Sequence, residues 1–302
     1  MKKLDGFVKQ IFIFVIVLIV LLGISLAIFF MRKYKKNYTK LPTKNKLLSS
    51  WQAKDYQKSL DQTKEILERR PDDANVRALH GFAAYYLSSA QTNETEAVDL
   101  LDDSIVSLRK ALYTIDQKDL VQVYYILGKA YYQKGYFYYD LSLKYLNKVF
   151  EMGGKYSDLN KFRGMAFSQL DENEKAIEAF TQALSSESDE FLLYALAKTY
   201  MKVDNLEKAK MYLTEAAEKA KDIMLKLNCK SKLAEVYFSE KKLEKARAEY
   251  ISILKLDETY ADAYYGLGLI YEQGGDLIAA RAEWRKALKA NPLHSKTIEK
   301  MK

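Results

Sequence analysis

The sequence predicts an all-α protein in which a solenoid of about seven helix pairs follows one N-terminal transmembrane helix. The 302-residue chain has only three prolines and twelve glycines, so few residues interrupt helices. One uncharged apolar segment is long enough to cross a bilayer. After it, a helical pattern of aromatic and small residues recurs about every 34 residues. The composition, 49% apolar with a single cysteine, excludes collagen-like, disordered and disulfide-scaffold proteins.

The apolar segment is residues 11–31, IFIFVIVLIVLLGISLAIFFM, which follows a short flank of residues 1–10. At 1.5 Å per residue this helix would span about 30 Å, the thickness of the hydrocarbon core of a membrane. The alternative is a secretory signal peptide cleaved near Ser25-Leu26-Ala27. The segment is longer than the usual apolar core of about 7–15 residues, which favours an uncleaved anchor.

The basic excess of the chain is confined to the membrane anchor and its flanks. Residues 1–46 hold ten Lys or Arg and the single acid Asp5, whereas residues 47–302 hold 38 basic and 39 acidic residues. The nearly neutral body gives no electrostatic reason to expect nucleic-acid binding. Three basic residues precede the span and seven follow it in the juxtamembrane linker, residues 32–46, which favours a single-pass protein with a cytoplasmic body. The start Lys2-Lys3 is also typical of an exported body, so both orientations stay open.

The repeating pattern is clearest near the C-terminus, as Tyr264-x2-Leu267-Gly268-x2-Tyr271 followed by Ala280-x3-Trp284-x2-Ala287. The same spacing recurs upstream, for example as Tyr124-x2-Leu127-Gly128-x2-Tyr131. In this spacing the chain resembles the tetratricopeptide repeat family. The resemblance implies a right-handed superhelical solenoid over residues 47–294, with repeats near 40–73, 74–120, 121–156, 157–189, 190–226, 227–260 and 261–294, and a tail of residues 295–302.

Small residues explain how each pair packs. A glycine or alanine of the first helix is expected to face an alanine or serine of the second, which lets the two axes approach closely. Three features are less regular. Residues 89–99 either lengthen a helix or form a loop, and the first repeat has a weak first helix suited to an end cap. The short tail leaves the last repeat exposed or free to pair with a second copy of the chain.

Few residues could support chemistry. The chain has two histidines and one cysteine, and it lacks a phosphate-binding glycine loop. His80 stands where the pattern expects a core leucine, so we interpret it as a buried structural residue. Cys229 has no cysteine partner, and we interpret it as a small, partly buried apolar residue. The sequence therefore predicts no catalytic, cofactor-binding or metal site, and a protein that is not an enzyme.

The resemblance implies that the first helices line a concave groove in which partners bind. The stripe beside the core face of each first helix should form that groove. Two interpretations stay open, because these side chains either bind a partner or only pack against the next repeat. The predicted groove residues are Phe82, Tyr85, Tyr125, Lys129, Tyr132, Phe191, Tyr194, Lys198, Phe238 and Tyr265.

A second predicted patch lies at the turn of the third repeat, which is two residues longer than the others. Seven aromatic residues surround this turn, more than packing requires. We therefore expect some of Tyr136, Tyr138 and Tyr139 to stay exposed for a partner or a membrane interface.

These features predict a non-catalytic, membrane-anchored scaffold that binds proteins or peptides through the groove. An alternative from another class is an accessory protein that binds a small apolar or carbohydrate ligand for an envelope transport or synthesis system. Self-association through the last repeat is a further possibility.

Overall fold

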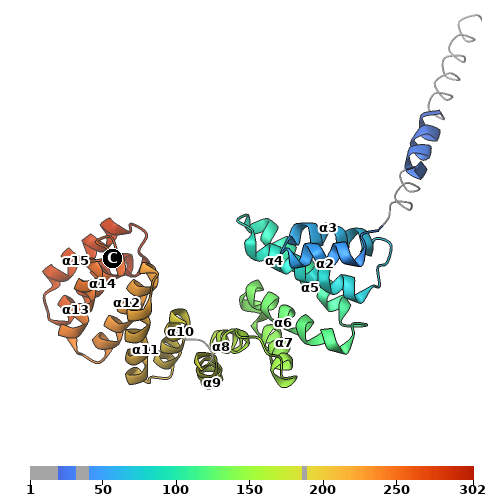
Figure 1. Cartoon of the computed structure of the whole chain (residues 1–302). Helices are drawn as coiled ribbons and strands as arrows, with labels where there is room; N and C mark the ends of the chain where they lie inside the picture. The colour runs from blue at the N-terminus through green and yellow to red at the C-terminus, as the bar shows by residue number, and fades with distance from the viewer. Residues whose placement is uncertain (1–19, 32–40, 186–188) are drawn as a thin grey trace, which may run out of the picture.

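The computed structural model describes residues 20–31, 41–185 and 189–302, and every regular element among them is a helix. Residues 20–31 form an isolated helix that leads toward the solenoid (Figure 1). The solenoid contains α2 (Lys44–Gln52), α3 (Tyr56–Leu67), α4 (Ala74–Ala90), α5 (Glu94–Ala111), α6 (Gln117–Lys134), the 3-10 turn η1 (Tyr136–Tyr138), α7 (Tyr139–Glu151), α8 (Leu159–Gln169), α9 (Asn173–Leu184), α10 (Glu190–Lys202), α11 (Leu206–Lys219), α12 (Ile223–Ser239), α13 (Leu243–Leu254), α14 (Ala261–Gln273), α15 (Leu277–Ala290) and α16 (Ser295–Met301).

Part of the predicted transmembrane segment lies outside the described residues, since residues 11–19 precede them. The apolar side chains of residues 20–31 make no contact that would bury them, and Leu22, Phe29 and Phe30 are each more than half exposed. Within the described ranges, no helix combines the length and the apolar character that crossing a bilayer requires.

The helices pack as consecutive antiparallel pairs, from α2 and α3 to α14 and α15, and the pairs stack into an open arc (Figure 1). Each first helix from α4 to α12 also contacts the first helix of the following pair. First helices therefore lie along the shorter, inner side of the arc, with second helices on the outer side. The apolar core runs along the arc as successive clusters between the pairs, as expected when each pair is stabilised by its neighbours.

Short turns with a repeated geometry separate the helices of a pair. Four of them contain a non-glycine residue in the left-handed region, Lys54, Asp171, Asp204 and Lys241, and Gly275 occupies the same region in the last pair. Several helices then start at an Asp or Asn whose side chain accepts a hydrogen bond from a backbone N–H of the first turn, as at Asn205 and Asp276. The sequence thus encodes both the end of one helix and the start of the next.

The close approach within a pair differs in detail from the sequence prediction. In α6, the backbone carbonyl of Gly128 accepts a hydrogen bond of 2.8 Å from the Ser142 hydroxyl. A Cβ on Gly128, however, would lie 2.6 Å from the side chain of Leu146, one helical turn after Ser142. Gly164 meets Phe180 in the same way. The glycines therefore make room for a large side chain, and the small residue of the second helix lies beside that contact.

Two open questions about the solenoid are resolved by helix lengths and ends. Residues 89–99 lengthen both members of a pair, so α4 has 17 residues and α5 has 18. The tail is not an extended end, because residues 295–301 form α16 against α15 and fully bury Thr297. Coverage of this end is incomplete, since Ile278 and Leu293 remain 83% and 84% exposed.

His80 joins three helices at the N-terminal end of the solenoid. Its ring is buried, with Nδ1 2.8 Å from the Thr63 hydroxyl and Nε2 2.9 Å from a carboxylate oxygen of Asp103. A carboxylate can only accept a hydrogen bond, so Nε2–H is the donor. The polar ring at this core position is therefore compensated by partners from α3 and α5. The hydrogen bond from His80 is also the main reason that the pKa of Asp103 lies below its ordinary value of 3.8.

We expect the stabilisation by Asp103 to depend on pH. A carboxyl group with a lowered folded-state pKa stabilises the fold above its ordinary pKa, and this contribution is lost as the pH falls through the folded-state pKa. Asp103→Ala should therefore cost about 1–2 kcal/mol at pH about 7, and clearly less at pH about 3. Denaturant midpoints of the full chain in mild detergent, measured across this range, test the prediction. The control is Asp99→Ala, because Asp99 is an exposed acid of the same helix. If the free energy of unfolding differs between Asp103→Ala and wild type by the same amount at all pH values, the prediction is contradicted.

Candidate functional site

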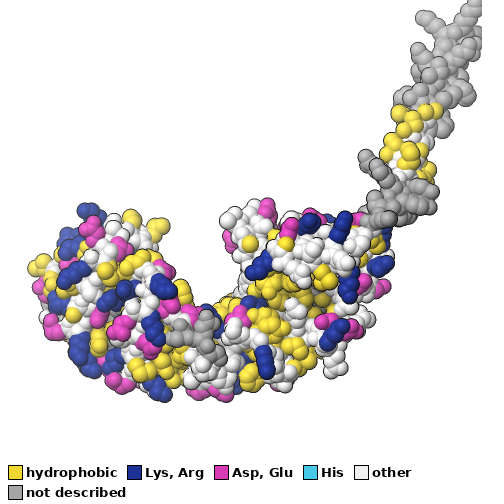
Figure 2. Space-filling view, in the orientation of Figure 1, with side chains coloured by type: hydrophobic (Ala, Val, Ile, Leu, Met, Phe, Trp, Pro, Cys, Tyr) yellow, Lys and Arg dark blue, Asp and Glu magenta, His cyan; other side chains and the backbone are white. Residues whose placement is uncertain are grey.

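The inner side of the arc carries aromatic side chains in its N-terminal half. Tyr86, Tyr132, Tyr156 and Phe162 are half-buried where the first helices α4, α6 and α8 meet, and we call them the inner aromatic strip. Tyr56 extends the strip by stacking on Tyr86 with ring centres 4.9 Å apart. Figure 2 shows hydrophobic side chains gathered over this part of the arc. A half-buried aromatic face offers apolar contact area with little loss of side-chain entropy on binding.

Asp158, at the start of α8, holds the strip together. Its carboxylate accepts a hydrogen bond from the Tyr125 hydroxyl and an ion-paired one of 2.7 Å from Lys129 Nζ. The same ammonium group lies 4.5 Å from the ring centre of Phe162. Burial and the hydrogen bond to Asp158 both raise the pKa of Tyr125, so its hydroxyl stays protonated as a donor. This bridge fixes α6 against α8 and neutralises the cation of the strip.

Tyr156 stacks directly on the ring of Tyr125. The two ring centres are 3.7 Å apart and the planes are within 5° of parallel. Two turns further along the same face of α6, Tyr132 meets Phe162 edge-on, with ring centres 5.5 Å apart. The stacking of Tyr156 on Tyr125 buries the ring of Tyr125 and leaves the ring of Tyr156 on the outside. The strip is therefore a packed platform whose outer rings remain accessible.

The ten predicted groove residues divide by exposure. Phe82, Tyr85 and Tyr125 are buried, at 7%, 6% and 7%, so we correct the expectation that they offer an open surface. Packing of Trp51 on Phe82, of Tyr86 on Tyr85 and of Tyr156 on Tyr125 accounts for their burial. The half-buried members are Lys129, Tyr132, Tyr194, Phe238 and Tyr265, and the exposed ones are Phe191 and Lys198.

Sequence reasoning missed Tyr86, Tyr156 and Asp158. Tyr156 and Asp158 lie in the turn before α8, where helical periodicity gives no direction for a side chain. Tyr86 lies one residue beyond the predicted stripe. One sequence signal could have identified Asp158: an aspartate directly before a first helix. The equivalent Asp189, before α10, also pairs with a lysine of the preceding first helix, Lys161 of α8.

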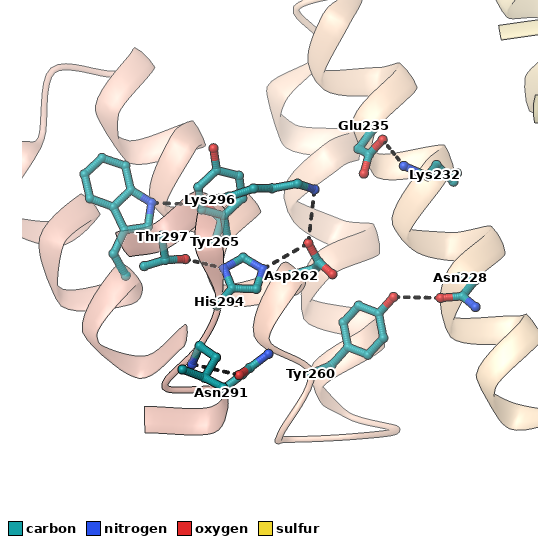
Figure 3. A network of polar contacts seen from close by, with 12 residues as sticks. Asn228, Lys232, Glu235, Tyr260, Asp262, Tyr265, Asn291, His294, Lys296 and Thr297 are labelled. Atoms are coloured by element: carbon teal, nitrogen blue, oxygen red, sulfur yellow. Dashed lines mark hydrogen bonds and ion pairs between the residues drawn. The ribbon is translucent and has the colours of Figure 1, made fainter. Parts of the chain in front are cut away.

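In the C-terminal half, polar side chains of α12, of α14 and of the segment that begins α16 form a network of contacts (Figure 3). The Tyr260 hydroxyl donates to Asn228 Oδ1 at 3.0 Å, which joins the turn before α14 to α12. Asp262 of α14 lies 3.2 Å from His294 Nε2 and 3.4 Å from Lys296 Nζ. Tyr265 contacts the His294 ring, with ring centres 5.6 Å apart. The C-terminal first helices are thus joined by polar contacts, and they also carry the half-buried rings of Tyr194, Phe238 and Tyr265.

The aromatic turn of the third pair is only partly exposed. Tyr136 is 74% exposed, and it is Phe137, outside the predicted patch, that joins it at 84%. Tyr138 stacks on Tyr131, and Tyr139 packs on Tyr132 at 5.4 Å. Gly135, with φ of 97°, directs the chain into η1 and so separates the two exposed rings from the two packed ones.

Cys229 and His294, which could in principle support chemistry, are buried and packed within the fold. Cys229 is fully buried, and burial raises the pKa of its thiol to about 12, which leaves little thiolate at neutral pH. His294 is buried beside Thr297, whose hydroxyl lies 2.6 Å from Nδ1. In the described part of the chain, no cluster of three or more His, Cys, Asp or Glu could hold a metal ion.

Comparison with known families supports the repeat pattern. A TPR repeat model matches residues 234–275, and tetratricopeptide repeat models match residues 261–294, 162–190 and 192–222. A curated relative, Superkiller protein 3 of Schizosaccharomyces pombe, is 28% identical in an alignment 136 residues long that covers 41% of this chain. The match spans only 10% of that relative's length.

Solved structures share the fold. The C-terminal part of a TPR repeat-containing protein from Cytophaga hutchinsonii superposes with a TM-score of 0.62 at 14% identity, over 85% of this chain and 98% of that one. MamA from Desulfovibrio magneticus RS-1 gives a TM-score of 0.52 at 17% identity, over 59% of this chain and 98% of that one. Family models and solved structures together support the tetratricopeptide repeat family and an all-helical tetratricopeptide solenoid.

Proposed function

We propose that this tetratricopeptide solenoid is a non-catalytic scaffold that binds partner proteins or peptides along its inner side. The observation that carries the proposal is the inner aromatic strip. Its outer rings are half-exposed, while their positions are fixed by Asp158 and by stacking. Rigid aromatic side chains that keep an accessible face are typical of binding hot spots. Solenoid curvature, moreover, creates the extended concave surface that repeat proteins use for binding.

Membrane anchoring is the second part of the proposal. Its support is the sequence, in which residues 11–31 are uncharged and flanked by basic residues on both sides. The anchor would hold the solenoid near the bilayer, and the excess of basic residues after the span favours a cytoplasmic location. Reporter fusions placed after residue 46 and at the C-terminus test the orientation. Release of the full chain from membranes by alkaline carbonate would contradict anchoring.

Capture of partners tests the inner aromatic strip. The full chain, solubilised from its native membranes in mild detergent, is compared with the double variant Tyr86→Ser, Tyr156→Ser by quantitative mass spectrometry of bound proteins. We expect at least one stoichiometric partner whose recovery falls about tenfold or more in the double variant, because each lost ring removes buried contact area. The matched control is Tyr113→Ser, since Tyr113 is 87% exposed and outside the strip.

The outcome separates the scaffold from a binding protein for small molecules. A co-purifying apolar or carbohydrate ligand in native mass spectra, with no protein partner, would contradict the scaffold. Equal loss of a partner in the control and the double variant would show that the strip is not the contact surface. Thermal melting of each variant confirms that the solenoid stays folded.

A further inference from the structure

A second candidate site lies on the outer side of the arc, away from the inner aromatic strip. Helices α7 and α8 and the first turn of α9 enclose an open groove of about 590 Å³. Both flanking helices, α7 and α9, are second helices of their pairs. Apolar side chains of Leu143, Phe150, Phe167 and Leu170 line much of the groove, and the Arg163 guanidinium lies among them. A groove of this size accommodates several residues of a peptide.

Arg163 occupies a position that other repeats of this chain fill with a core leucine. In the repeat pattern it directly precedes the small residue of the first helix, as do Leu127, Leu196, Leu233 and Leu267. These four leucines are at most 7% exposed. An arginine at a core position carries a desolvation cost that leucine does not. The same burial lowers the pKa of Arg163.

Neutral groups hold the guanidinium in place. Its Cζ lies 3.9 Å from the ring centre of Phe150, and Nε and Nη1 donate hydrogen bonds of 2.9 Å to the side-chain oxygens of Asn147 and Asn160. Among the described residues, no carboxylate lies within ion-pair distance of Arg163. Two asparagine amides and an aromatic face orient the N–H donors of the guanidinium, and the carboxylates that act on its charge, Glu178 and Glu151, do so from beyond ion-pair distance.

His80 provides the contrast within the same chain. It occupies the equivalent position in α4, and its ring is matched by Asp103 at 2.9 Å. The polar side chain at that core position thus has a direct anionic partner, whereas the acids that act on Arg163 lie beyond ion-pair distance. The neighbouring charges do not change this. Lys175 pairs with Glu172, and the rim also carries Asp140, Lys144 and Glu151, of which Glu151 favours the charged form of Arg163 from beyond ion-pair distance.

We propose that Arg163 binds the carboxylate of a Glu or Asp in a peptide segment of a partner protein, with flanking apolar residues of the peptide packed on Leu143 and Leu170. Guanidinium and carboxylate are geometrically complementary, and the pair would be strengthened by the apolar walls of the groove. This site is distinct from the inner side on which the proposed scaffold function rests.

Peptide pools test the proposal on the full chain in mild detergent. One pool of labelled nine-residue peptides has a fixed central Glu with mixed Leu, Phe, Ser and Asn flanks; the second pool has Gln in its place. Fluorescence anisotropy should show that the Glu pool binds about tenfold or more tightly, the range expected for a charge-assisted hydrogen bond. Arg163→Gln should abolish the preference. Arg109→Gln, which removes an exposed arginine of α5, should leave it unchanged.

A second variant separates binding from folding. Arg163→Leu restores the residue of the other repeats, so we expect its Tm to equal or exceed that of the wild type while the Glu preference is lost. Equal binding of both pools to the wild type would overturn the proposal, as would a selective response only to a pool with central phosphoserine. Tyr86→Ser and Tyr156→Ser should leave the Glu preference intact, which distinguishes failure of this site from failure of the proposed scaffold function.

Discussion

Gly268→Ala should destabilise the last helix pair by about 2 kcal/mol. A Cβ on Gly268 would lie 2.2 Å from Nε1 of Trp284, far inside contact distance. The indole is 3% exposed and donates a hydrogen bond of 3.3 Å to the Tyr265 carbonyl, so it cannot move without losing packing and this bond. The loss outweighs the gain in helix propensity of about 1 kcal/mol that accompanies Gly→Ala in a helix.

Denaturant unfolding of the full chain, followed by tryptophan fluorescence and circular dichroism, measures this effect. Gly274→Ala is the matched control from the end of the same helix. At Gly274 the nearest atom to an added Cβ is 3.5 Å away and φ is −78°, so alanine fits without displacement. We expect a change of less than about 1 kcal/mol there. Similar midpoints for the two variants would show that Trp284 adapts and that close approach is unimportant.

Asp158→Ala should cost about 2–3 kcal/mol, because it removes one acceptor shared by two buried or half-buried donors. Lys129 would keep its charge beside Phe162 without the carboxylate at 2.7 Å, and the Tyr125 hydroxyl would lose its partner. Since these contacts join α6 to α8, the variant should also loosen the inner aromatic strip. Denaturant midpoints measure the stability, and the partner capture described above measures the second effect.

Asp116→Ala is the control for Asp158→Ala. Both aspartates precede a first helix, and neither side chain caps its helix by a hydrogen bond. Asp116 is paired only with Lys118, at 3.8 Å, and both side chains are more than half exposed. An exposed ion pair of this kind contributes about 0–1 kcal/mol. An equal cost for the two substitutions would mean that Asp158 acts only through the helix terminus, and that the bridge to α6 adds nothing.

The sequence predicted the helix pairs correctly because the same packing contacts recur from one repeat to the next. Spacings such as Leu267-Gly268-x2-Tyr271 fix which side of a helix is small or apolar, so the helix pairs and their order follow from local pattern. The pattern also identified His80 as a residue in a core position. It could not show that Asp103 provides the hydrogen-bond acceptor for the buried His80 ring, since the two residues are 23 positions apart and lie on different helices.

The predicted groove shows the limit of the same reasoning. A helical stripe gives the direction of a side chain from its own axis, but its exposure depends on the curvature of the whole arc. Phe82, Tyr85 and Tyr125 are nevertheless buried, by neighbours such as Trp51 of α2 and Tyr156 of the turn before α8. The outer rings of the strip come from Tyr86, one position beyond the predicted stripe of α4, and from Tyr156 in a turn, where periodicity gives no direction for a side chain.

By itself, the sequence determined the class of the protein: an apolar segment with basic flanks, then tandem helix pairs whose small and aromatic residues recur at a fixed spacing. These properties are local, because each depends on residues within about one repeat. Tertiary structure decided which aromatic rings stay accessible, which cations have a partner and how the chain covers its own end. Lys129 and Arg163 are both cations of first helices, yet packing brings a carboxylate within ion-pair distance of Lys129, whereas the acids that act on Arg163 stay farther away. The cost of burying a charge depends on groups that only the folded chain brings within reach.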